Sequence, residues 1–217
     1  MYDLYFWTTP NGYKPLIMLE EIEATYTIKP VNIGKDEQFA PEFLRIAPNN
    51  RIPALVDHAP AEGSGPLSVF ESGAILTYLA EKSGRFMTKS LAGRTQAMEW
   101  LMWQMGGLGP MAGQAHHFLG RSGEPNTYAI ERYTNECKRL YGVMDRHLKG
   151  RDYLAGEYSI ADMASYPWVW RHKRHQVSLE DYPNVRDWYA RIGGRPALAR
   201  ASVRGAAANP SVETLLP

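Results

Sequence analysis

The sequence of 217 residues contains one cysteine, Cys137. A single thiol excludes an internal disulfide framework and any metal site that needs several thiolates. Cys137 lies in the middle of a helical pattern, and no neighbour in the sequence would obviously lower the pKa of its thiol. We therefore expect a packed thiol at this position and not a nucleophile.

The sequence also lacks a charge excess and a long apolar run. Its formal net charge is +1, so neither a nucleic acid nor a membrane is indicated as a partner. No stretch approaches about 18 uninterrupted apolar residues, and the first residues, MYDLYFW, contain no basic segment ahead of an apolar core. We expect a cytoplasmic protein with a catalytic or small-molecule role.

Histidine is present, but its spacing does not favour a metal site. The adjacent His116 and His117 do not share a helical face, and His172 with His175 lacks a third ligand. We expect no bound metal and interpret both segments as a solvated basic face.

The apolar pattern changes character near residue 85. Before it, short β-like segments alternate with helical patterns, and after it every readable pattern is helical. The first part has the order strand, helix, strand, helix, strand, strand, helix, which is the order of the thioredoxin-like fold. We therefore expect an α/β domain over residues 1–85 and an all-helical domain over residues 92–208.

The expected elements of these domains can be placed by residue number. Strands are expected at 2–6, 25–32, 53–58 and 67–71. Helices are expected near 15–22, at 40–48, from 72 onward, near 98–105, and at 127–148, 159–175 and 182–196. The glycines and proline of GGLGP, residues 106–110, should kink or break the helix before them.

Pro53, in the stretch RIPALV, stands at the start of an expected strand. Proline is tolerated there because it cannot donate a hydrogen bond to a neighbouring strand. A cis Ile52–Pro53 bond would turn the backbone N–H and C=O of Ile52 outward and offer a peptide ligand a short antiparallel pairing. A plain strand start is the alternative, because only about 5–6% of X-Pro bonds in folded proteins are cis.

In FESGAI, a strand passes through Glu71 into a helix whose first residue is Ser72. The free N–H groups at a helix start bind a carboxylate, and the Ser72 hydroxyl adds a donor. Glu71 could accept a hydrogen bond from an ammonium group. The pair therefore suits a free amino-acid group, and the alternative is a capping serine beside a solvated glutamate.

The first expected strand ends in TTPNG, which would overhang the same crevice if this strand lies beside the Pro53 strand. Thioredoxin-like redox proteins carry cysteines at this turn, and this sequence has none. Thr8, Thr9 and Asn11 can donate hydrogen bonds there, but they are not strong nucleophiles without a neighbouring base. A turn that only caps the following helix is the alternative.

Together these motifs resemble one family. Similarity to the bacterial Nu-class glutathione transferases, the disulfide-bond oxidoreductase branch of that superfamily, is carried by TPNGYK, PEFLRIAPNNRIPALVDH, LSVFESGAILTYLAEKSG, GGLGPMAGQAHHF, YAIERY and YSIADMASYPW. It runs from about residue 2 to about residue 200 and includes both expected domains. The resemblance implies the glutathione transferase architecture, with a thioredoxin-like and a helical domain, and a homodimer.

The resemblance also implies the residues that activate the glutathione sulfur. Thr9 and Asn11 would donate hydrogen bonds to it. This sequence has Trp7 and Thr8 directly before Thr9, so Thr8 competes for the donor role. Tyr5 is a further alternative, because other glutathione transferases use a tyrosine near the end of the first strand.

The remaining implied contacts hold the tripeptide. Glu71 and Ser72 would bind its γ-glutamyl end, and Ile52, ahead of Pro53, would pair through its backbone with the cysteinyl unit. Two further residues would bind glutathione carboxylates, Gln38 in the first domain and Arg132, bidentately, from the helical domain.

The implied activity is glutathione-dependent disulfide-bond oxidoreduction, with reduced or oxidised glutathione as co-substrate and a small disulfide or electrophile as the other substrate. A free thiol has a pKa of about 8.5, and thiol–disulfide exchange is fastest when the pKa of the attacking thiol lies near the ambient pH. One or two hydrogen-bond donors are therefore enough to activate it. The alternatives are conjugation of glutathione to electrophiles and a binding module without catalysis.

Overall fold

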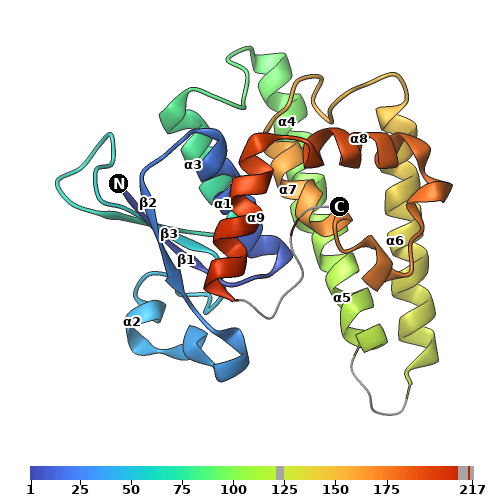
Figure 1. Ribbon diagram of the computed structural model, residues 1–217, viewed down its shortest axis with the longest axis horizontal. Helices are drawn as coiled ribbons and strands as arrows, with labels where there is room; N and C mark the ends of the chain where they lie inside the picture. The colour runs from blue at the N-terminus through green and yellow to red at the C-terminus, as the bar shows by residue number, and fades with distance from the viewer. Residues whose placement is uncertain (121–124, 210–214, 216–217) are drawn as a thin grey trace. The chain divides into compact units, whose positions relative to one another are not determined.

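The computed structural model describes residues 1–120, 125–209 and 215. The chain divides into two compact units (Figure 1). The first contains Met1–Met87 and the C-terminal segment that begins at Arg195, and the second contains Thr88–Gly194. The division near residue 87 lies close to the change in apolar pattern.

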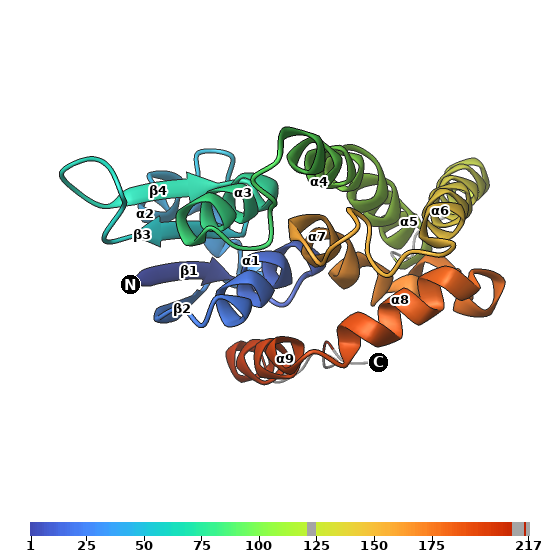
Figure 2. The same ribbon diagram turned by 90° about the horizontal axis from the view of Figure 1, so that it is seen from above.

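The first unit is built on a four-stranded sheet with the order β2-β1-β3-β4, which Figure 2 shows side by side. The strands are β1 (Tyr2–Phe6), β2 (Tyr26–Pro30), β3 (Ala54–Asp57) and β4 (Leu67–Phe70). β2 runs parallel to β1, whereas β3 is antiparallel to both β1 and β4. The thioredoxin-like fold is confirmed.

Strand alternation places helices on both faces of this sheet. The helices are α1 (Pro10–Glu21), α2 (Pro41–Leu44) and α3 (Ser72–Ser83). The buried Phe6 meets Tyr13 of α1 edge-on, with ring centroids 5.4 Å apart. Tyr5 points to the opposite face and packs against Phe43 of α2 at a centroid distance of 5.8 Å. The sheet therefore lies between α1 and α2.

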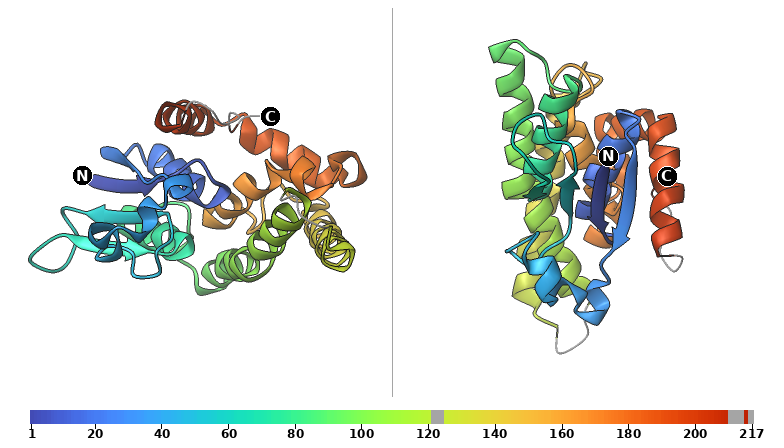
Figure 3. Two further views of the ribbon diagram at one scale, coloured as in Figure 1. Left: turned by 90° about the horizontal axis from the view of Figure 1, so that it is seen from below. Right: turned by 90° about the vertical axis from the view of Figure 1, so that its left-hand side faces the viewer.

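The helix α9 (Pro196–Ala208) belongs to the first unit and was not expected as a separate helix. It packs along α1, as Figures 2 and 3 show. A Cβ at Gly205 would lie 2.4 Å from a ring carbon of Tyr13, so only glycine permits this approach. Arg195 forms an ion pair with Glu21 at 2.5 Å. The predicted helical domain, residues 92–208, thus includes a helix that packs with the first unit. The predicted domain ranges, 1–85 and 92–208, stay predictions.

The second unit is helical, as expected. Its longer helices are α4 (Leu91–Trp103), α5 (Gly109–Gly120), α6 (Thr127–Leu148), α7 (Ile160–Val169) and α8 (Pro183–Gly193). A π-helical turn, Gln104–Leu108, joins α4 to α5 at the segment where a kink or break was predicted. Among the described residues, no helix is both long and apolar enough to cross a membrane.

The expectation of a solvated basic face is wrong for His175. This residue has no exposed surface, and its ring stacks on His116 of α5 at a centroid distance of 4.2 Å. Burial lowers the pKa of His175 to about 2 and that of His116 to about 4. Residues 172–175 do not continue the predicted helix 159–175: α7 ends at Val169, and a short 3-10 helix turns His175 inward.

Candidate functional site

The turn after β1 is shaped by its threonine and glycine. Thr9 is the N-cap of α1, and its Oγ1 accepts a hydrogen bond from the Gly12 N–H at 3.1 Å. Gly12 is required because a Cβ there would lie 2.1 Å from the carbonyl oxygen of Trp7. Thr9 therefore caps α1, and its predicted role as a donor to glutathione stays a prediction. Because this bond uses an oxygen lone pair, the hydroxyl proton of Thr9 can still be donated to a ligand.

The other candidate donors of this region have different surroundings. Thr8 is buried, and its Oγ1 accepts a hydrogen bond from the side-chain amide of Asn209 at 2.8 Å. Asn11 is half-buried in the first turn of α1. Tyr5 packs under α2, and burial, followed by the charge of Asp3, raises the pKa of its hydroxyl. Thr8 and Tyr5 are thus engaged with Asn209 and α2, and the donor roles of Thr9 and Asn11 stay predictions.

The Ile52–Pro53 peptide bond is cis, so the plain strand start is excluded. In the described part of the chain, the Ile52 backbone groups have no hydrogen-bond partner. β3 begins one residue after Pro53, and its Ala54 pairs with both Tyr5 and Phe70. Ile52 therefore lies at the end of the sheet where β1 and β4 finish. The turn that contains Thr9 follows β1 at the same end.

Glu71 and Ser72 follow β4 at the same end of the sheet. The backbone of Glu71 has a φ of 69°, a left-handed conformation that costs a non-glycine residue about 1–3 kcal/mol. Its carboxylate accepts a hydrogen bond from the Asn49 side chain at 3.3 Å. The start of α3 has no side-chain cap, so Ser72 does not cap this helix. The exposed carboxylate and the uncapped helix start fit the ammonium and carboxylate of a free amino-acid group.

Lys14 is the residue of this region that the sequence reasoning missed. Its exposed fraction is 1%, and its Nζ donates a hydrogen bond to Oγ of Ser72 at 3.4 Å. Burial lowers the pKa of Lys14 well below its ordinary value, and the charge of Glu71 opposes that lowering. A lysine between the apolar residues of TPNGYKPLIML was the available signal. It brings the start of α1 into contact with the start of α3.

Gln38 lies on a different element from the other predicted site residues of the first unit. It is buried in a short 3-10 helix, Glu37–Phe39, and its Nε2 donates a hydrogen bond to Asp36 at 3.3 Å. Its Oε1 is buried and has no partner among the described residues. The second amide hydrogen and this oxygen can therefore serve a ligand.

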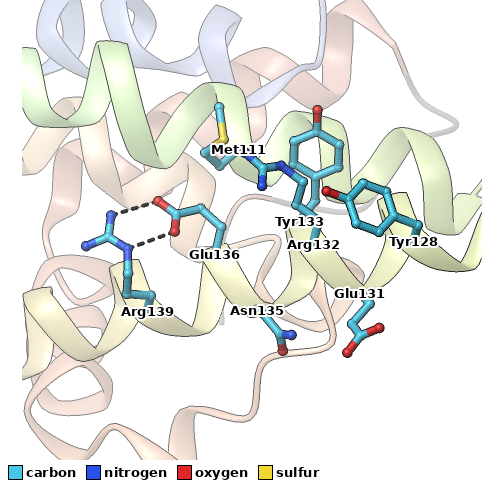
Figure 4. Close-up of a pocket in the computed structure, with 8 residues that line it drawn as sticks. All are labelled: Met111, Tyr128, Glu131, Arg132, Tyr133, Asn135, Glu136 and Arg139. Atoms are coloured by element: carbon cyan, nitrogen blue, oxygen red, sulfur yellow. Dashed lines mark hydrogen bonds and ion pairs between the residues drawn. The ribbon is translucent and has the colours of Figure 1, made fainter.

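Arg132 belongs to the second unit, on α6. Figure 4 shows it beside Met111 in a cavity of about 670 Å³. The cavity is lined by Met111, Tyr128, Glu131, Arg132, Tyr133, Asn135, Glu136 and Arg139. Both oxygens of Glu136 accept hydrogen bonds from Arg139 at 2.7 Å. Arg139 and, to a smaller extent, the charge of Arg132 hold the pKa of Glu136 below its usual value, so Arg132 is a cation of this cavity that could bind a ligand carboxylate.

The protein's own thiol is packed, as predicted. Cys137 of α6 has no exposed surface. Burial, with a smaller effect from the charge of Glu136, raises the pKa of its thiol to about 12. At neutral pH this sulfur is protonated and inaccessible, so it does not act as a nucleophile in the folded protein.

A thioredoxin-like unit that carries hydroxyl and amide groups where its redox relatives carry cysteines, followed by a helical unit, is the arrangement of a glutathione transferase. Family models agree: the N-terminal domain of glutathione S-transferases matches residues 2–81, and the C-terminal domain matches residues 109–196. The chain belongs to the glutathione S-transferase family.

Individual relatives are similar over almost the whole chain. The disulfide-bond oxidoreductase YfcG of Escherichia coli is 52% identical over 94% of this chain and 95% of its own. A glutathione transferase from Pseudomonas putida, solved with one glutathione disulfide per subunit, is 45% identical with a TM-score of 0.88, covering 92% of this chain and 90% of its own. A glutathione transferase family member from Pseudomonas fluorescens, solved with two glutathiones bound, is 44% identical with a TM-score of 0.85. The match covers 92% of this chain and 91% of that one.

Proposed function

We propose that the protein is a glutathione-dependent disulfide-bond oxidoreductase. The observation that carries this proposal is the 52% identity to the disulfide-bond oxidoreductase YfcG, which extends over almost the full length of both chains. A second disulfide-bond oxidoreductase of the same bacterium, YghU, is 40% identical over 92% of this chain and 73% of its own. Such similarity to two proteins with one activity favours that activity over others in the family.

The chemistry of the site supports a reacting sulfur that belongs to bound glutathione and not to the protein. The one cysteine of the chain is buried with a raised pKa, so the reacting thiolate has to arrive with the substrate. In the proposed site, Thr9 and Asn11 donate hydrogen bonds to the glutathione sulfur. Hydrogen bonds to a charged form stabilise it, and each unit by which they lower the thiol pKa corresponds to about 1.36 kcal/mol.

The rest of the tripeptide has matching partners. Ile52 offers its backbone N–H and C=O to the cysteinyl unit, and the γ-glutamyl end binds at Glu71 and Ser72. Gln38 and Arg132 bind carboxylates, the latter bidentately. Crystal structures of similar glutathione transferases with bound glutathione or glutathione disulfide support this ligand.

The proposed reaction consists of two exchanges. The thiolate of bound glutathione attacks one sulfur of the substrate disulfide, which forms a mixed disulfide and releases the other sulfur as a thiolate that takes up a proton. A second glutathione thiolate then attacks the glutathione sulfur of the mixed disulfide and releases the second substrate thiol. Two glutathiones are oxidised to one glutathione disulfide, and one substrate disulfide is reduced to two thiols.

Turnover of a small disulfide with reduced glutathione tests the proposal, with oxidised glutathione followed through glutathione reductase and NADPH. We expect catalysis above the uncatalysed rate, and a higher kcat/KM than for conjugation of glutathione to a chloroaromatic compound. Faster conjugation would make the protein a transferase of the conjugating kind. Glutathione binding by calorimetry without turnover of either substrate would make it a binding module.

Two broader features belong to the same proposal. The protein is a homodimer, as its family resemblance implies, and it acts in the cytoplasm, where reduced glutathione is maintained. A small-molecule disulfide is the proposed second substrate, and neither a metal nor a nucleic acid takes part.

A further inference from the structure

Arg132 shares its cavity on α6 with a carboxylate that can compete for it. Glu136 lies four residues after Arg132 on the same helix, and residues at this spacing are neighbours on a helix surface. Hydrogen bonds from Arg139 and, to a smaller extent, the charge of Arg132 lower the pKa of Glu136. Glu131 also lines the cavity, but it directly precedes Arg132, and consecutive residues do not face each other on a helix. Glu136 is therefore an acid that could occupy Arg132 in place of a ligand.

Arg139 binds this carboxylate instead. Nε and Nη2 of Arg139 donate hydrogen bonds to the two oxygens of Glu136, each at 2.7 Å. A bidentate pair is stronger than a single charge-assisted hydrogen bond, and an acid that precedes its cation on a helix is better oriented than one that follows it. Both effects favour Arg139 over Arg132 as the partner of Glu136. Figure 4 shows Glu136 turned toward Arg139, whereas Arg132 lies beside Met111.

Stability alone is a weak reason for this pair, because 59% of the Arg139 side chain is exposed and exposed ion pairs contribute little. We propose that Arg139 is a positioning residue for ligand binding: by engaging both oxygens of Glu136, it keeps that carboxylate from pairing with Arg132 and leaves the Arg132 guanidinium to a glutathione carboxylate. The inference rests on the proposed function, which assigns Arg132 to that carboxylate. Without Arg139, the ligand has to displace Glu136 from Arg132.

Calorimetric titration with glutathione disulfide separates this role from a structural one. Arg139→Met should raise the dissociation constant by about fivefold, because the released Glu136 competes with the ligand for Arg132. Adding Glu136→Gln removes the competitor, so the double variant should bind within about twofold of the wild type. Arg132→Met should weaken binding by itself, and Arg139→Met should add less than about twofold to that loss, because Arg139 acts through Arg132.

Lys138→Met is the matched control. It removes one positive charge from an exposed position of α6 directly before Arg139, so the dissociation constant should stay within about twofold of the wild type. Circular dichroism verifies the folding of each variant, and Arg139→Gln serves if Arg139→Met does not fold.

The outcomes distinguish this inference from the function on which it rests. If Arg139→Met binds like the wild type, or if its loss persists in the double variant or in the Arg132→Met background, the inference alone is overturned. An Arg132→Met protein that binds like the wild type would remove Arg132 from the proposed site and overturn the inference with it. A wild type that does not bind glutathione disulfide would overturn the proposed function as well.

Discussion

The Thr9 hydroxyl, between β1 and α1, has two roles. Thr9 accepts the hydrogen bond that caps α1 and, in the proposed mechanism, donates its proton to the glutathione sulfur. The adjacent Thr8 is buried and accepts a hydrogen bond from Asn209. Removal of the hydroxyl from Thr9 and from Thr8 should therefore affect the pKa of the glutathione thiol differently.

Thr9→Val should raise the pKa of bound glutathione by about one unit, because a donor to the thiolate is lost. The pKa is read from the ultraviolet absorbance of the thiolate as the pH of the complex is varied. Thr9→Ser restores both the cap and the donor and should behave like the wild type. Thr8→Val should leave the pKa nearly unchanged, and a larger shift there than in Thr9→Val would reverse the assignment.

At the residue scale, local structure could be predicted where local chemistry decides it, whereas the roles of the site residues stay predictions. The helix start at Ser72 could be predicted because a strand that passes into a helix has a recognisable pattern, and the strand start beside Pro53 because a proline before a strand has few conformations. Neither the left-handed backbone of Glu71 nor the contact between Thr8 and Asn209 could be predicted. Both depend on packing between segments far apart in the sequence, which no local pattern encodes.

At the scale of elements, α9 shows what a periodicity search misses. The helix packs along α1, and its fit depends on the absence of a side chain at Gly205, against Tyr13. Glycine has a low helix propensity, so the residue that permits this packing also weakens the sequence signal for the helix. The strands and α6, by contrast, have clean patterns, and α6 begins and ends where predicted, at Thr127 and Leu148.

Gly205→Ala should lower the free energy of unfolding by about 1–3 kcal/mol, because the new methyl group overlaps the Tyr13 ring. Urea unfolding measures the change. Gly120→Ala, at the end of α5, is the matched control, since a Cβ there meets nothing within 4 Å among the described residues. A Gly205→Ala protein as stable as this control would show that α9 does not pack on α1 as described.

The stacked His116 and His175 predict how stability depends on pH. Burial keeps both rings neutral in the folded protein, with pKa values of about 4 and about 2, whereas an unfolded histidine titrates near 6.5. Below pH 6.5 the unfolded chain therefore binds more protons than the folded one. The free energy of unfolding should fall as the pH is lowered from 6.5 toward 4.

His116→Gln should make this decline shallower, because one of the two groups no longer titrates. Denaturant unfolding of both proteins at several pH values between 4 and 7 measures the difference. Burial raises the pKa of Asp162 in the same unit to about 6, which acts in the opposite direction, but that contribution is present in both proteins and cancels in the comparison. Parallel curves for the two proteins would contradict the description of the cluster.

For the whole molecule, the family resemblance predicts a homodimer. Light scattering behind size exclusion should give twice the chain mass of 24.5 kDa. A mass equal to one chain at micromolar concentration would contradict the expectation.

The central claim is that the reacting sulfur belongs to glutathione and not to the polypeptide. Cys137→Ala removes the one thiol of the chain and, because that thiol is buried with a pKa of about 12, should touch no step of the reaction. The decisive measurement is kcat/KM for reduction of a small disulfide by glutathione, with folding of the variant verified by circular dichroism. The account predicts a value within about twofold of the wild type. A folded Cys137→Ala protein without activity would show that the protein's own thiol carries the reaction.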